Sequence, residues 1–161
     1  MSIIYTGIFF DLTLFERIML LRPFVQFQGW EDGDLEDVVL AAVQRTHPRI
    51  FLQHTTLQFR PHPDSDHVRH VLENEGEEIR VRVTGRSDIS EPAWALVVEP
   101  DPLRMQQFRI ECANDIPHIT AATAEGVSPA TSNEVLARGH ETVVHPFTLT
   151  GRLGVFRGGN Q

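Results

Sequence analysis

The stretch HTTLQF, residues 54–59, places a histidine two residues before a threonine, and HITAAT, residues 118–123, repeats that arrangement. Both stretches are rich in residues that favour β-strands, and side chains two apart in a strand project to the same side. His54 and Thr56 therefore share one face of an expected strand, and the second stretch offers the same pair. Two such strands lying close together would surround one concave space with two imidazoles and two hydroxyls.

Two imidazoles and two hydroxyls are sufficient for phosphodiester hydrolysis without a metal. The reaction deprotonates a water on one side of phosphorus and protonates a leaving oxygen on the other, and histidine titrates near neutrality. The hydroxyls would donate to the non-bridging phosphate oxygens, where charge must be stabilised. The sequence thus predicts that His118 and Thr120 join the first pair in one catalytic site, with no cofactor and no metal ion.

The doubled motif resembles the two-histidine (2H) phosphoesterase superfamily. HTTLQF and HITAATAEGV (118–127) are similar to the two signatures of its 2′,3′-cyclic nucleotide 3′-phosphodiesterase and tRNA-ligase-associated branch, and IIYTGIFF (3–10) resembles the first strand of that branch. The resemblance implies an α+β, bilobal fold with two antiparallel sheets, helices outside and a cleft between them. It also implies hydrolysis of the 2′,3′-cyclic phosphate of a nucleotide or an RNA end to a 2′-phosphate.

The same resemblance implies roles for individual residues. The four motif residues would be catalytic, with His118 as the base that activates water and His54 as the acid. Four further positions match substrate-contacting residues, two aromatic ones near the nucleobase and two in the loop after the second motif: Tyr5, Phe59, Val127 and Pro129.

The sequence departs from that family at three points. Ala121 stands where a large aliphatic residue is usual, and Ile116 stands where the branch often has a basic residue. An arginine clamp on the phosphate would then have to come from the closing strand, where Arg152 and Arg157 lie. The chain is also compact for the family, so substrate-selecting loops are expected to be short or absent.

Composition favours a single globular domain. The chain has 161 residues, of which 41% are hydrophobic, and this is enough for one sizeable core. We expect one domain over residues 1–158 and a flexible tail over 159–161. The apolar runs near the N-terminus are far shorter than the roughly 20 residues that span a bilayer, so we expect a cytoplasmic protein without a membrane segment.

The charge argues against a long nucleic-acid ligand. The formal net charge is -8, and all 14 basic residues are arginine; many phosphate contacts need clustered cations. A small cyclic nucleotide or a single RNA end remains compatible with this balance. Cys112 is the only cysteine, so no internal disulfide is possible, and its apolar neighbourhood indicates a buried side chain.

Hydrophobic patterning predicts more strands than helices, with neighbours that suit antiparallel pairing. We expect helices after Asp11 up to Leu21 and in two further segments, 34–47 and 128–139. We expect strands in IIYTGIFF and in five further segments, the last of which holds one or two strands: 49–59, 77–85, 93–99, 115–123 and 141–159.

One segment supports a competing interpretation. HPDSDHVRH, residues 62–70, comes within one residue of the zinc signature of metallo-β-lactamase-like hydrolases, and its imidazoles and carboxylates could hold one or two metal ions. The same segment also fits a solvated turn before a short helix whose start is capped by Asp64 and Asp66. We favour the solvated turn.

Two functional alternatives use the same four motif residues. One is a hydrolase of cyclic di- or oligonucleotide signals, which would differ in pocket size. The other is a module that binds a cyclic nucleotide or an RNA end without cutting it. Turnover separates the second alternative from an enzyme, and activity that survives a chelator separates both from a metal hydrolase.

Overall fold

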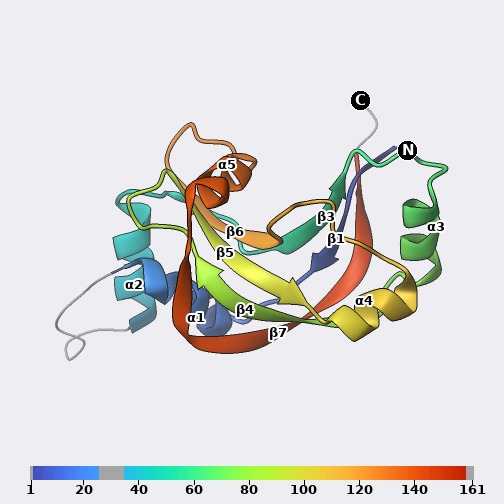
Figure 1. Cartoon of the computed structure of the whole chain (residues 1–161). Coiled ribbons are helices and arrows are strands. Elements are labelled where there is room, and N and C mark those ends of the chain that lie inside the picture. Colours follow the sequence, from blue (N-terminus) through green and yellow to red (C-terminus); the bar gives the residue numbers. More distant parts are fainter. Residues whose placement is uncertain (1, 26–34, 159–161) are drawn as a thin grey trace.

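The computed structural model describes residues 2–25 and 35–158, and the expected tail at 159–161 lies outside them. The described residues form the α+β architecture expected from the sequence (Figure 1). The strands are β1 (Ile3–Phe9), β2 (Arg49–Ile50), β3 (His54–Phe59), β4 (Glu78–Arg86), β5 (Ala93–Pro100), β6 (His118–Thr123) and β7 (Glu141–Arg157). The helices are α1 (Leu14–Leu21), α2 (Leu35–Gln44), α3 (Asp66–Glu73), α4 (Pro102–Phe108) and α5 (Thr131–Arg138), with a 3₁₀ turn, η1, at Arg22–Phe24.

The strands form one strongly curved antiparallel sheet whose ends meet. Its order is β2-β6-β3-β1-β7-β4-β5, and β6 also pairs with β5, so six strands close into a ring with β2 attached at β6. The pairings therefore do not divide the strands into two separate sheets. Closure leaves few unpaired strand edges, which is one way in which β-proteins avoid edge-to-edge association.

The ring closes through very little contact between β3 and β6. Only Thr55 and Ile119 are paired in register there, and both side chains are fully buried. The single strand expected over residues 49–59 is instead two, because Leu52 adopts a left-handed backbone conformation with φ of 53°. The Leu52 side chain is buried in the core, so the turn at this position is stabilised by packing.

The hydrophobic core lies on one face of the curved sheet. Alternate residues of β4 point into it, with Ile79, Val81 and Val83 fully buried, as the alternation of this segment predicts. Helices α1 and α2 cover one end of the sheet, and α3 and α4 lie at the other end (Figure 1). The core thus holds both ends of a sheet whose middle carries the two histidine motifs.

Several local expectations need correction. Helix α3 is capped by Ser65, whose Oγ accepts from Val68 N–H, so the expected caps Asp64 and Asp66 are wrong. Helix α4 was not predicted from the sequence, although Asp101 followed by proline is a start signal and its carboxylate does cap the helix. The closing segment, expected to hold one or two strands, is one strand, β7, of 17 residues.

Gly151 of β7 lies where the sheet packs tightly on β1. A Cβ at this position would come within 2.5 Å of Ile8 Cγ2 and 2.8 Å of a Phe10 ring carbon. We expect Gly151→Ala to lower the free energy of unfolding by about 1–3 kcal/mol, because the core must shift to accept the methyl group. Urea unfolding measures this. The matched change Gly154→Ala, whose nearest neighbours are Phe9 ring carbons at 3.3 and 3.4 Å, should cost clearly less, and an equal cost would contradict the packing account.

Candidate active site

The Thr55–Ile119 pair sets the geometry of the two motifs. Directly opposed residues of an antiparallel pair share a face, and their sequence neighbours project to the other face. One residue further in each direction, the register sets His54 beside Thr120 and Thr56 beside His118. Because the central pair points into the core, all four motif residues lie on the opposite face. The structure therefore brings the four predicted residues together.

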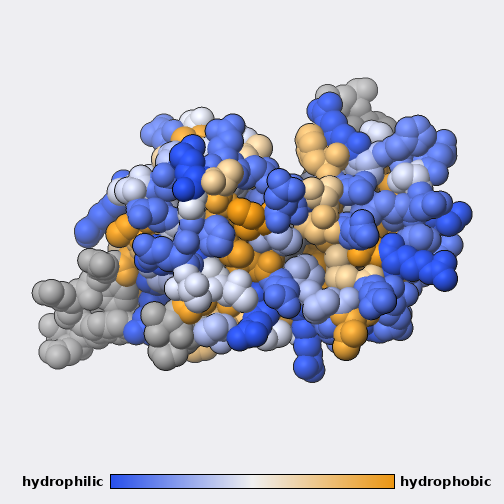
Figure 2. Space-filling model, viewed as in Figure 1, coloured by the Kyte–Doolittle hydropathy of each residue, from blue (hydrophilic) through white to orange (hydrophobic). Residues whose placement is uncertain are grey.

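The place where β3 and β6 meet lies below a hollow in the molecular surface. Figure 1 shows β3 and β6 meeting in the middle of the curved sheet, and Figure 2, in the same view, shows a notch in the surface above this place. Apolar side chains are visible at the floor of the notch, between two more polar prominences. A ligand entering the notch would approach the motif residues from one side.

His118 is held as one neutral tautomer. Its Nδ1 lies 2.9 Å from the Ile116 carbonyl oxygen, and because a carbonyl only accepts, Nδ1 carries the proton. Its Nε2 is then left unprotonated. The side chain is 8% exposed, and burial lowers the pKa of His118, an effect that the bond to Ile116 partly opposes. His118 is therefore prepared to accept a proton at Nε2.

His54 lies between a hydroxyl and an aromatic ring. Its Nε2 is 3.1 Å from Thr56 Oγ1, and Tyr5 stacks on the imidazole with ring centroids 4.6 Å apart. The Tyr5 hydroxyl lies 3.5 Å from Nδ1. Burial, followed by the charge of nearby His118, lowers the pKa of His54 to about 4. The two imidazoles are thus close enough that protonation of one disfavours protonation of the other.

Thr120 contacts the segment that follows the second motif. Its Oγ1 lies 2.9 Å from Ser132 Oγ and 3.4 Å from the Pro129 carbonyl oxygen. Pro129 therefore lies beside the motif face. Val127 is half-buried in the same loop, and its N–H donates to the Ala124 carbonyl.

An aromatic row crosses three strands beside the histidines. Phe59 of β3 and Phe156 of β7 both lie opposite Tyr5 of β1, and the Tyr5 and Phe156 rings stack with centroids 5.0 Å apart. The row depends on a bulge in β3, where Leu57 has no partner across β1. Without that extra residue, Phe59 would point away from His54.

Two side chains at the site were missed from the sequence. Ser132 touches Thr120, and its only sequence signal is a position in the first turn of the helix expected after the second motif. Phe156 has an unusual exposure of 49% for a phenylalanine within a strand, and the outermost ring of the row, Phe59, has 64%. An aromatic residue near the C-terminus of the last strand gave no signal that it would lie opposite Tyr5.

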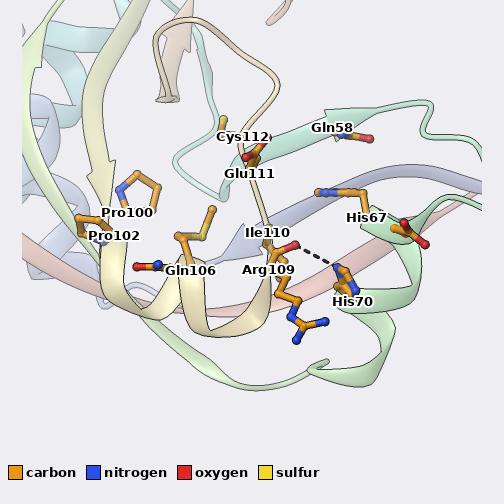
Figure 3. A pocket seen from close by; sticks show the side chains of 12 residues that line it. Gln58, His67, His70, Pro100, Pro102, Gln106, Arg109, Ile110, Glu111 and Cys112 are labelled. Carbon is orange, nitrogen blue, oxygen red and sulfur yellow. Dashed lines mark hydrogen bonds between the residues drawn. The ribbon is translucent and has the colours of Figure 1, made fainter.

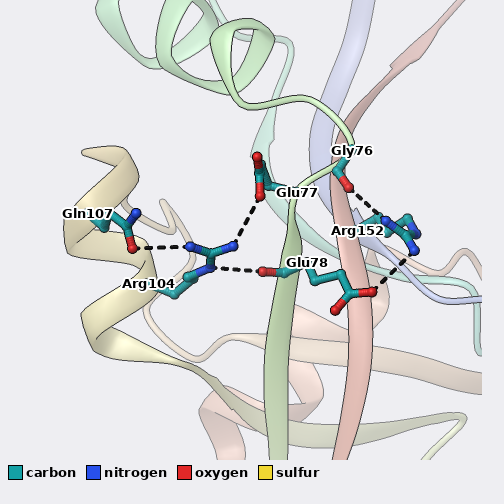
Figure 4. Close-up of polar contacts among 6 residues, drawn as sticks. All are labelled: Gly76, Glu77, Glu78, Arg104, Gln107 and Arg152. Carbon is teal, nitrogen blue, oxygen red and sulfur yellow. Dashed lines mark hydrogen bonds and ion pairs between the residues drawn. The ribbon is translucent and has the colours of Figure 1, made fainter.

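The two arginines expected as possible phosphate clamps pair with carboxylates. Arg152 donates to the Gly76 carbonyl at 2.9 Å and to Glu78 at 3.2 Å, close to a second network around Arg104 (Figure 4). Arg157 lies 3.9 Å from Glu75. Both guanidinium groups are therefore held by other partners.

The histidine-rich segment 62–70 uses its side chains in separate local contacts. His67 Nε2 lies 2.7 Å from the buried Thr6 hydroxyl, and His70 Nδ1 donates to the Arg109 carbonyl at 3.0 Å. His67 and His70 line a pocket that none of the four motif residues lines, with Gln58 and Cys112 across from them (Figure 3). His62 Nδ1 accepts from Asp64 N–H instead.

Two features are absent from residues 2–25 and 35–158. No group of three or more His, Cys, Asp or Glu side chains there is placed to hold a metal ion. None of the helices in that part of the chain is long and apolar enough to cross a membrane.

Comparison with known proteins finds a family model that matches part of the chain. Residues 71–149 match the family model of the fungal tRNA ligase phosphodiesterase domain, which belongs to the 2H phosphoesterase superfamily of cyclic phosphodiesterases. The match includes the second motif, all of β4, β5 and β6 and the first part of β7, and it begins after the first motif. No curated protein matches the chain. The match confirms the resemblance found in the sequence and supports a cyclic phosphodiesterase activity in general terms.

The pKa of His54 predicts a pH-dependent stability. The unfolded chain, with an ordinary histidine pKa near 6.5, binds more protons between pH 6.5 and 4 than the folded protein does. Stability should therefore fall as the pH drops through this range, and this loss is absent above pH 7. We expect His54→Gln to lose roughly 2 kcal/mol less than the parent between pH 7 and 4.5, measured by urea unfolding. His62→Gln, at an exposed position, is the control, and identical losses in the parent and His54→Gln would contradict the prediction.

Proposed function

We propose that this chain is a 2H phosphoesterase, as its match over residues 71–149 indicates, and that it hydrolyses the 2′,3′-cyclic phosphates of nucleotides or RNA ends to 2′-phosphates without a metal ion. The catalytic groups are the two imidazoles and two hydroxyls on the face behind the Thr55–Ile119 pair. The observation that carries the proposal is their arrangement, in which each histidine of one motif lies beside the threonine of the other. The parts of the curved sheet on either side of the notch above β3 and β6 are the walls of the substrate cleft.

His118 is the base in this mechanism. Its Nδ1 proton is held by the Ile116 carbonyl, so the unprotonated Nε2 is the atom that takes the proton from the attacking water. Burial keeps the pKa of His118 below its usual value, so the ring is neutral at pH 7 and ready for this role. As Nε2 becomes protonated, the negative phosphate stabilises the imidazolium.

His54 is the acid. When the Tyr5 hydroxyl donates to Nδ1, the Nε2 of His54 carries the proton and points towards Thr56 and the motif face. The pKa of about 4 belongs to the site without substrate, and a bound phosphodiester anion raises it by attracting the charged form. The protonated Nε2 then donates to the leaving ribose oxygen.

Thr56 and Thr120 bind the phosphate through their hydroxyls. The charge on the non-bridging oxygens grows towards the transition state, so donors aimed at them stabilise the transition state. The chain has no lysine, and the candidate arginines Arg152 and Arg157 are engaged with Glu78 and Glu75. Neutral donors therefore carry this part of the mechanism.

The aromatic row is the binding surface for the nucleobase. Phe59 and Phe156 are exposed at its ends, and Tyr5, which lies opposite both in the strand register, stacks on Phe156 and on the acid His54. Base stacking on an aromatic ring is tolerant of sequence, which suits an enzyme that acts on ends of different sequence. The net charge of -8 favours a mononucleotide or one RNA end over a long duplex. A cytoplasmic location is part of the proposal.

Hydrolysis of 2′,3′-cyclic AMP in excess chelator, followed by phosphorus NMR, tests the proposal. We expect conversion to the 2′-monophosphate, and a loss of roughly 10²- to 10⁴-fold in both His54→Ala and His118→Ala, because each removes a proton-transfer group. The exposed His62→Ala is the matched histidine control and should retain parental activity.

The negative outcomes are distinct. Turnover that is lost in chelator and restored by a divalent ion would overturn the metal-free mechanism. Turnover of a cyclic dinucleotide alone would move the chain to the class that degrades cyclic dinucleotide signals. Tight binding of the cyclic nucleotide with no turnover would make the chain a binding module.

A substrate that needs no acid separates the roles of the two histidines. A p-nitrophenyl phosphodiester releases a leaving group that departs without protonation. With this substrate, His54→Ala should recover most of its lost rate relative to the parent, whereas His118→Ala should remain impaired by roughly 10²- to 10⁴-fold. The release of nitrophenolate, measured by absorbance, reports both rates. The opposite pattern would exchange the acid and the base.

A further inference from the structure

We infer that Ser132 is a positioning residue that holds and polarises the Thr120 hydroxyl for phosphate binding. The inference rests on the proposed function and extends it to a residue of α5 that lies outside both motifs. Ser132 is fully buried, and its Oγ lies 2.9 Å from Thr120 Oγ1. No other polar contact of this hydroxyl is found in the described part of the chain.

The hydrogen bonds around Thr120 have one favoured direction. The Pro129 carbonyl can only accept, so the contact at 3.4 Å is a bond from the Thr120 hydroxyl. If Thr120 donated to Ser132 instead, the buried Ser132 hydrogen would lack an acceptor, which is unfavourable. The favoured chain of bonds therefore runs from Ser132 to Thr120 and from Thr120 to Pro129.

Phosphate binding would redirect only one of these bonds. The bond from Thr120 to Pro129 is long, and Pro129 also accepts from Ser132 N–H at 3.1 Å, so its carbonyl stays satisfied when Thr120 leaves it. The Thr120 hydrogen then turns to a non-bridging phosphate oxygen. The bond from Ser132 remains and makes Thr120 a stronger donor, because successive hydrogen bonds polarise one another.

The surrounding structure fixes the Ser132 hydroxyl in place. Ser132 lies in the first turn of α5, and the neighbouring Val135 and Leu136 are buried against the sheet. The loop before the helix is closed by a backbone bond from Thr131 N–H to the Ser128 carbonyl at 3.0 Å. Among the described residues, no serine contacts the Thr56 hydroxyl, which contacts His54. This relay, the hydrogen bond from Ser132 to Thr120, is therefore specific to the second motif, which holds the base His118.

A double-mutant cycle with Thr120 tests this role. We expect Ser132→Ala to lower kcat for 2′,3′-cyclic AMP about tenfold, with a smaller change in KM, because the lost bond strengthens in the transition state. In a Thr120→Ala background, the same change should cost less than about twofold, since Ser132 acts only through Thr120. Ser132→Thr keeps the hydroxyl and should recover much of the activity. Ser128→Ala is the matched control, because this exposed serine of the same loop caps Ala130 N–H and does not touch Thr120.

The results distinguish a positioning role of Ser132 from a merely structural role. Equal losses in both backgrounds would show a merely structural role and overturn the inference, as would a Ser132→Ala variant with parental kcat while His54→Ala and His118→Ala are inactive. Urea unfolding of each variant identifies any that fail to fold, and the cycle is then completed with Ser132→Cys, which preserves volume but is a weak donor. A parent protein that neither hydrolyses nor binds the cyclic nucleotide overturns the proposed function and the relay together.

Discussion

One backbone pairing, between Thr55 and Ile119, determines the rest of the site. It closes the six-strand ring, and it sets the register in which two distant segments of sequence present their polar residues to one face. Both of its side chains are fully buried, so a slip of one residue would turn the motif histidines into the core and expose apolar residues. The free-energy cost of that slip keeps the four motif residues in their observed geometry.

Burial and proximity together make it unfavourable for both histidines to be charged. Removing them from water disfavours the charged form of each, and their proximity disfavours charging both. A site of this kind holds one proton more easily than two, which is the condition that acid and base catalysis by a pair requires. In the proposed reaction, the anionic substrate supplies the missing stabilisation, so the proton is best held when the substrate is present.

Much of this arrangement could be predicted from the sequence, because strand alternation and the doubled motif are local signals. His54 shares a face with Thr56, and His118 with Thr120, because side chains two apart in a strand project to the same side. The register between the motifs, the turn at Leu52 and the bulge at Leu57 do not, since each depends on packing between distant segments. The start of α4 at Asp101-Pro102 was readable and was missed, whereas nothing local marked Phe156 or the contact of Ser132 with Thr120.

The two motifs are related by a local twofold axis through the Thr55–Ile119 pair, and such symmetry makes the two sides of the phosphorus equivalent. The neighbours of each motif remove that equivalence. The Ile116 carbonyl and Ser132 contact the second motif, and Tyr5 contacts the first. In the proposed reaction, these unrepeated neighbours would determine which ribose oxygen leaves. Exchange of such partners between the halves is a route by which the same four residues could evolve to open the ring in the other direction.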